Sequence, residues 1–130
     1  MPAYPLTTIA TLVALFVYAV LSFLVGKART TYGIVAPAVT GNVEFEKRYR
    51  VQMNTIEQLA LMLPVLWLCA GWVGDLYAAL GGIVWSLGRI IYARGYYSAP
   101  EKRGPGFGLT FLPSVVMFIA VLGAVVRSML

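Results

Sequence analysis

The segment Arg50-Val51-Gln52-Met53-Asn54-Thr55-Ile56-Glu57 brings charged and amide side chains to the start of a long apolar stretch. From Ile56 to Val73 nearly every residue is apolar, which is typical of a helix that crosses a lipid bilayer. Because an α-helix turns by about 100° per residue, Arg50, Asn54 and Glu57 lie on one face of that helix. A polar face is costly in lipid and should contact protein, water or a ligand. We therefore interpret this face as a binding site that the rest of the chain frames.

The composition is typical of an integral membrane protein. Of the 130 residues, 60% are hydrophobic and only 12% are charged, whereas soluble domains carry about 25% charged residues. There is no histidine and Cys69 is the only cysteine, so we expect neither a metal site nor an intrachain disulfide bond. The sequence thus predicts a single membrane domain over residues 1–130.

Four apolar segments, separated by stretches rich in turn-forming residues, predict an all-α integral membrane protein, a four-transmembrane-helix bundle. A tight turn separates the second segment from the third, and we expect Asp75 to cap the third helix. Gly81 and Gly82 in the third helix should let another helix approach closely. The predicted helices cover about residues 6–26, 46–72, 76–98 and 109–129.

The distribution of basic residues predicts the orientation in the membrane. Nine of the ten lie in or beside the connections that follow the first and third helices, and Arg127 lies at the other end. The positive-inside rule places those connections in the cytoplasm and both termini on the opposite side. This topology accounts for the net charge of +5 without a nucleic-acid partner.

Two interpretations of the polar face of the second helix remain open at this point. Arg50 and Glu57 are two helical turns apart, about 10 Å along the axis, so they do not obviously satisfy each other. The face is either a ligand site or an intramembrane ion pair that holds helices together. Gln52 lies on the opposite face of the same helix, which indicates an oligomer in which Gln52 faces a neighbouring subunit.

The third helix carries a second polar face. Arg89, Tyr92 and Tyr96 share one side at its cytoplasmic end. They are either interfacial anchors or, together with the polar face of the second helix, the wall of a shared pocket. Such a pocket would offer guanidinium groups for carboxylates, a carboxylate for an amine, and amide and phenol groups for peptide bonds. This chemistry fits a small zwitterionic, peptide-like anion that enters from the cytoplasm, with a hydrophobic co-substrate delivered by the lipid.

Two sequence elements, residues 45–57 and 89–96, resemble the MAPEG family, the membrane-associated proteins in eicosanoid and glutathione metabolism. The first contains an Arg-x-Gln-x-Asn-x-x-Glu pattern that begins at Arg50, and the second a Tyr-x-x-Gly-Tyr pattern that begins at Tyr92. The resemblance extends from Arg29 into the fourth helix, which is nearly the whole chain.

The resemblance implies a homotrimer of four-helix bundles that binds glutathione as co-substrate between neighbouring protomers near the cytosolic side. It implies that Arg103 stabilises the glutathione thiolate. It also implies that Arg29 and Gln52 contact glutathione from the neighbouring protomer, which agrees with the opposite-face position of Gln52. The contacts implied for the first protomer are Arg50, Asn54, Glu57, Tyr92 and Tyr96.

Two departures from the family pattern bear on the substrate. Thr30 stands where leukotriene-synthesising members have a second arginine, and Gln58 replaces a pocket tyrosine. Both departures argue against leukotriene synthesis as the activity of this chain. The short connections and the lack of an extension resemble a bacterial member, so we expect the bacterial inner membrane rather than the endoplasmic reticulum.

The expected function is that of a glutathione-dependent transferase or peroxidase whose thiolate attacks a lipophilic electrophile or a lipid hydroperoxide. A non-catalytic membrane scaffold that presents lipid to a partner, as some members of the family do, is the alternative. A small transporter subunit is a third interpretation, because transporters also use charges inside the membrane.

Overall fold

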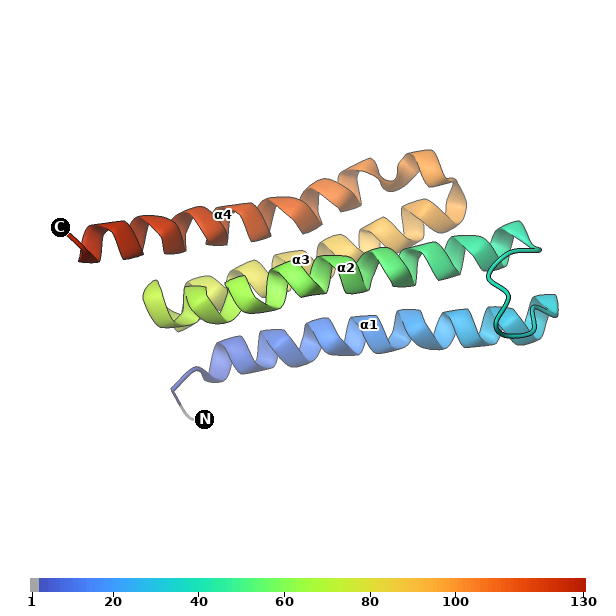
Figure 1. Cartoon of the computed structure of the whole chain (residues 1–130), viewed down its shortest axis with the longest axis horizontal. Helices are drawn as coiled ribbons and strands as arrows, with labels where there is room; N and C mark the ends of the chain where they lie inside the picture. The colour runs from blue at the N-terminus through green and yellow to red at the C-terminus, as the bar shows by residue number, and fades with distance from the viewer. Residues whose placement is uncertain (1–2) are drawn as a thin grey trace.

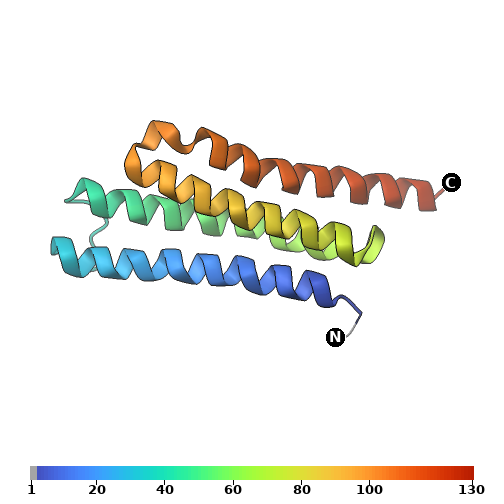
Figure 2. The ribbon, with the colours of Figure 1, turned by 180° about the vertical axis from the view of Figure 1, so that it is seen from behind.

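The computed structural model describes residues 3–130 and places four long helices side by side (Figure 1). Helices α1 and α4 lie on opposite sides of the bundle, with α2 and α3 between them, and the reverse view shows the same order (Figure 2). The C-terminus, the start of α1 and the α2–α3 turn lie at one end, and the other two connections lie at the opposite end. The elements are α1 (Pro5–Tyr32), α2 (Val43–Trp72), α3 (Asp75–Ser98), the 3-10 helix η1 (Pro100–Arg103) and α4 (Gly104–Ser128).

The predicted four-helix, all-α membrane fold is confirmed, and the chain is a multi-pass membrane protein. All four long helices are long and apolar enough to cross a membrane. The buried residues of α1 recur every three or four positions, as a helix packed on one side requires. Its outward side carries large apolar residues, and the side chains of Phe16 and Phe23 are each 70% exposed. A surface of this kind is stable in contact with lipid chains.

Two helix limits differ most from the prediction, and α2 also begins three residues earlier than expected, at Val43. Helix α1 continues past residue 26 to Tyr32 and ends at Gly33, whose φ of 68° and N–H bond to the Arg29 carbonyl form a helix cap. Helix α4 begins at Gly104 instead of residue 109, because Pro105 in the first turn loses no helical hydrogen bond. The apolar stretch therefore indicates a membrane-spanning segment, but it does not determine the residues at which the helix begins and ends.

The close approach expected at the glycine pair of α3 is present. A Cβ atom at Gly82 would lie 3.0 Å from the Cβ of Ala10 on α1 and 3.2 Å from a methyl group of Leu66 on α2. Small residues at helix crossings allow the dispersion contacts that hold membrane helices together. Helix α3 is thus packed tightly in the middle of the bundle, against both of these neighbours.

Asp75 caps a different helix from the one predicted. Its carboxylate accepts hydrogen bonds from the backbone N–H groups of Leu6 at 3.0 Å and Thr7 at 2.8 Å, and from the Thr7 hydroxyl at 2.7 Å. The N-cap of α3 is Gly74, which has no side chain to offer. The prediction that Asp75 caps the third helix is therefore wrong. Since Asp75 is the first residue within α3, its side chain reaches the free N–H groups of α1 at the same end of the bundle.

We expect Asp75→Ala to lower the unfolding temperature of the detergent-solubilised protein by about 3–5 °C, because the first turn of α1 loses its acceptors. Thermal unfolding followed by far-ultraviolet circular dichroism measures this. Asp75→Asn keeps one acceptor oxygen and should lose less. Glu101→Ala removes an acid from an exposed position of η1 and serves as the control. Equal unfolding temperatures for Asp75→Ala and the unchanged chain would contradict this role.

Candidate functional site

A cavity of about 290 Å³ lies where α2, α3, η1 and α4 meet, and we call it the polar pocket. Six of the eight residues that the sequence analysis assigned to a site line this pocket, so the structure brings them together. Their role in binding stays a prediction. Met53 and Phe107 also line the pocket and were not predicted. The lining residues are Arg50, Met53, Asn54, Glu57, Tyr92, Tyr96, Arg103 and Phe107.

The charged residues that α2 contributes are not paired with each other. The two salt bridges formed within residues 3–130 both involve Glu44, which contacts Lys47 at 3.0 Å and Arg48 at 2.8 Å. Arg50 and Glu57 take part in neither, and both side chains are exposed and line the pocket. This arrangement favours a ligand site over the intramembrane ion pair, since a pair would have joined the two charges directly.

Helix α3 supplies two tyrosines to the pocket. The rings of Tyr92 and Tyr96 lie one helical turn apart with their centroids 5.8 Å from each other. Tyr92 is 3% exposed and packed into the bundle, whereas Tyr96 is partly exposed near the end of the helix. Both tyrosines face the polar face of α2, so the interpretation of a wall shared by the second and third helices fits the geometry better than that of interfacial anchors.

Arg89 lies behind this wall and does not line the pocket. Its side chain is completely buried, and its Nη2 atom donates to Asn54 Oδ1 at 3.2 Å and to Thr55 Oγ1 at 3.0 Å. The guanidinium carbon lies 4.1 Å from the centroid of the Tyr92 ring. The grouping of Arg89 with Tyr92 and Tyr96 therefore needs correction, because the arginine contacts two pocket residues from inside the bundle.

Two glycines bring Arg103 and Phe107 to the pocket. A Cβ atom at Gly106 would overlap the backbone N and Cα atoms of Tyr92, so α4 can lie against α3 only if this residue has no side chain. A Cβ atom at Gly95 would lie 2.5 Å from the Lys102 carbonyl oxygen. The sequence pattern indicated a loop rich in helix breakers here. In the structure these glycines instead lie where α3 contacts η1 and α4 closely. They fix the segment that carries Arg103.

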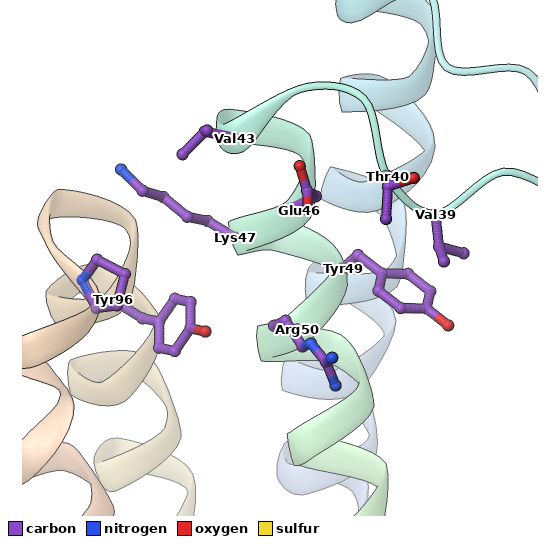
Figure 3. A pocket seen from close by; sticks show the side chains of 9 residues that line it. Val39, Thr40, Val43, Glu46, Lys47, Tyr49, Arg50 and Tyr96 are labelled. Carbon is purple, nitrogen blue, oxygen red and sulfur yellow. The ribbon is translucent and has the colours of Figure 1, made fainter.

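A second cavity of about 320 Å³ adjoins the polar pocket and shares Arg50 and Tyr96 with it (Figure 3). In the close view Tyr96 extends from α3 toward α2, where Arg50 lies below Glu46 and Lys47. The Lys47 ammonium group is held by Glu44 and by the Tyr97 carbonyl oxygen at 3.3 Å. The two cavities together continue the polar face of α2 toward the end of the bundle.

Arg29 and Gln52 do not reach the polar pocket of their own chain. The Arg29 Nη1 atom donates to the Ala38 carbonyl at 2.7 Å, and its guanidinium lies 4.8 Å from the centroid of the Phe45 ring. The Gln52 Nε2 atom donates to the Ser22 hydroxyl on α1 at 3.1 Å. Arg29 belongs to α1, and Gln52 lies on the face of α2 that contacts α1. A contact of these residues with the pocket of a second protomer stays a prediction.

The fold and the pocket define a class: a multi-pass helical membrane protein with a charged, ligand-sized cavity at the end of the bundle that carries most of the basic residues. The model of the MAPEG family matches residues 7–123. The chain belongs to the MAPEG family, as the sequence elements around Arg50 and Tyr92 predicted.

Three relatives illustrate the similarity. An uncharacterized protein of Synechocystis, sll1147, is 51% identical over 112 residues, which cover 86% of this chain and 82% of the relative. Microsomal glutathione S-transferase 2 of Homo sapiens is 37% identical over 100 residues, 77% of this chain and 67% of the relative. Leukotriene C4 synthase of Bos taurus is 34% identical over 93 residues, 72% of this chain and 62% of the relative.

We expect Gly106→Ala to destabilise the protein by about 1–3 kcal/mol, because the added methyl group pushes α4 away from Tyr92. Gly108→Ala is the matched control, since it lies two residues along the same helix with no atom of another element within 4 Å of the added Cβ. The control should be neutral or more stable, because alanine is the better helix former. Unfolding in a series of denaturing detergent concentrations measures both. Equal stability of the two variants would contradict the tight α3–α4 contact.

Proposed function

We propose that the chain is a glutathione-dependent membrane transferase that activates the glutathione thiolate for attack on a lipophilic electrophile, with peroxidase activity toward lipid hydroperoxides. The observation that carries the proposal is the polar pocket, in which α2, α3 and η1 present two guanidinium groups, a carboxylate, an amide and two phenols to one cavity. Relatives named for glutathione S-transferase and leukotriene C4 synthase activities support the same conclusion.

The pocket is complementary to glutathione in charge and in hydrogen bonding. Guanidinium groups such as those of Arg50 and Arg103 bind carboxylates through paired hydrogen bonds. Glu57 suits the α-ammonium group, while the amide and the phenols suit the peptide groups. Two cations and one carboxylate give the lining one net positive charge. Glutathione with its thiol protonated has two carboxylates and one ammonium group, and therefore the opposite net charge.

The chemical role proposed for Arg103 is stabilisation of the sulfur anion. A free thiol has a pKa near 8.5 and only the thiolate is nucleophilic. A guanidinium beside the sulfur lowers that pKa, and each unit corresponds to about 1.4 kcal/mol. A decrease of roughly two units makes the thiolate the main form at neutral pH.

Two reactions follow from a bound thiolate. In transfer, the sulfur forms a bond to an electrophilic carbon while the leaving group departs with its electron pair. In peroxide reduction, the sulfur attacks the terminal hydroxyl oxygen of the hydroperoxide. The O–O bond breaks, the sulfur becomes a sulfenic acid, and the lipid leaves as an alkoxide. The resulting alkoxide takes up a proton, and a second glutathione converts the sulfenic acid to the disulfide and water.

The aromatic residues of α4 support a lipophilic second substrate. Phe107 lines the polar pocket and stacks on Phe111, with 5.7 Å between the ring centroids and 8° between the planes. Each of the two side chains is 43% exposed on the outer surface of the bundle. An apolar molecule dissolved in the lipid can therefore follow this pair of rings to the pocket.

We further propose that the protein is a homotrimer in which Arg29 and Gln52 of one protomer complete the pocket of the next. The pocket then lies on the cytoplasmic side of a bacterial inner membrane, where glutathione is available. The basic residues at that end support the orientation, and the cyanobacterial relative supports the location.

We expect Arg103→Ala to bind glutathione with an affinity close to that of the unchanged protein but to lose the ultraviolet absorbance of the bound thiolate at neutral pH. The physical reason is that the guanidinium stabilises the sulfur anion, while other residues hold the tripeptide. Glutathione binding and difference absorbance across a pH series measure the two effects separately. Lys102→Ala removes the neighbouring exposed cation and is the matched control.

The same measurement discriminates between the functions. An unchanged thiolate signal in Arg103→Ala would remove Arg103 from the mechanism. Absence of glutathione binding to the unchanged protein would overturn the proposed function and leave the lipid-presenting scaffold as the interpretation. Glutathione-independent flux of a solute into proteoliposomes would instead favour a transporter.

A site shared between protomers predicts complementation. Arg29→Ala and Glu57→Gln chains, each expressed alone, should bind glutathione weakly, because every site lacks one contact. In mixed oligomers, some sites combine the intact Arg29 of one chain with the intact Glu57 of another and should bind normally. Equilibrium binding to affinity-purified mixed oligomers measures this recovery. Binding by the mixture that equals the mean of the two separate variants would contradict a shared site.

A further inference from the structure

Arg89 is a buried cation whose hydrogen-bonding capacity is only partly used. It is fully buried in α3, and its Nη2 atom bonds both Asn54 and Thr55 of α2. Its Nε and Nη1 atoms are buried without a hydrogen-bond partner in the described chain. Neither salt bridge of residues 3–130 involves it. A charge in this state is costly inside a membrane helix, and an apolar side chain of similar length would pack there without that cost.

The contact with Asn54 determines which half of its amide group faces the polar pocket. The carbonyl oxygen of Asn54 accepts the Arg89 hydrogen bond from inside the bundle at 3.2 Å. The oxygen and the NH₂ group lie on opposite sides of a planar amide, so the NH₂ group is directed away from Arg89. No acceptor within residues 3–130 binds this NH₂ group, and Asn54 lines the pocket. The pocket is thereby given a hydrogen-bond donor at this position.

Arg89 also contacts the second wall of the pocket. Its guanidinium lies 4.1 Å from the centroid of the Tyr92 ring, within the range of a cation–π interaction. Tyr92 lines the polar pocket from α3, whereas Asn54 lines it from α2. One buried side chain therefore touches a pocket residue on each of the two helices, and holds both from behind.

We propose that Arg89 is a positioning residue that fixes Asn54 as a hydrogen-bond donor and holds Tyr92 beside it, so that the pocket selects a ligand with a peptide or carboxylate oxygen at that point. The proposal rests on the proposed function in taking glutathione as the ligand. Arg89 lies outside the pocket lining and acts mainly through Asn54, with a smaller contribution through Tyr92. Without Arg89 the amide is free to rotate and to present its carbonyl oxygen, which repels the same ligand oxygen.

A double-mutant cycle tests the proposal on the detergent-solubilised full chain, with glutathione as the probe. Arg89→Met should weaken glutathione binding by about ten- to hundredfold, the usual effect of losing a hydrogen bond to a charged group. Asn54→Ala should weaken binding to a similar degree. The double variant should bind only slightly more weakly than Asn54→Ala alone, because the main effect of Arg89 passes through the Asn54 side chain, which is already absent, and only the contact with Tyr92 remains to be lost. Isothermal titration calorimetry measures the four dissociation constants.

Two further variants separate positioning from packing. Thr55→Val removes the other hydrogen-bond partner of Arg89 but no pocket atom, and should bind glutathione within about twofold of the unchanged chain. Arg89→Lys keeps the charge without the planar fork and should bind with intermediate affinity. Circular dichroism and the elution volume in size-exclusion chromatography verify that each variant is folded. If Arg89→Met does not fold, Arg89→Lys replaces it in the double-mutant cycle.

The outcomes are distinguishable. Coupled losses in the cycle together with normal binding by Thr55→Val support the positioning role. Additive losses, unchanged binding by the Arg89 variants, or an equal loss in Thr55→Val overturn it and leave the proposed function intact. Absence of glutathione binding to the unchanged chain overturns the proposed function, and with it the ligand that this inference assumes.

Discussion

Lipid offers no partner to a charge or to an unpaired polar group, and this constraint organises the whole structure. Many large apolar side chains are exposed on the outer surfaces of the four helices, and Asp75 satisfies the N–H groups of Leu6 and Thr7 at the start of α1, at one end of the bundle. At the opposite end the ionisable groups of α2, α3 and η1 turn toward one another around a cavity. The pocket is the place where polar side chains can be accommodated without facing lipid.

The pocket depends on close packing of α1 and α2 against one part of α3 and of α4 against another. Gly82 lets α1 and α2 pack against α3 in the half of that helix nearer the α2–α3 turn, and Gly106 lets α4 lie on the backbone of Tyr92. The second contact sets the position of the segment that carries Arg103 and Phe107. Side chains at these two positions would separate the helices. The groups that form the pocket would then no longer share one cavity, although every one of them would still be present in the sequence.

The polar face of α2 could be predicted because the positions of Arg50, Asn54 and Glu57 around a helix follow from their spacing alone. The partner of Asp75 and the burial of Arg89 could not, because both depend on which helix packs against them. The start of α4 was missed for a related reason. Pro105 is harmless in a first turn and Gly106 is required by its contact with Tyr92, so residues that usually break helices are compatible with one here.

The spacing of charges along α2 also explains why the pocket is left open to a ligand. Glu44 and Arg48 are four residues apart, adjacent on the helix surface, and pair at 2.8 Å. Arg50 and Glu57 are seven apart, on the same face but two turns from each other, and remain unpaired within the described chain. A carboxylate at position 54 in place of the amide would neutralise Arg50 and bind Arg89 as well. The observed sequence instead keeps an uncharged donor between two separate opposite charges, and a zwitterionic ligand can satisfy all three groups at once.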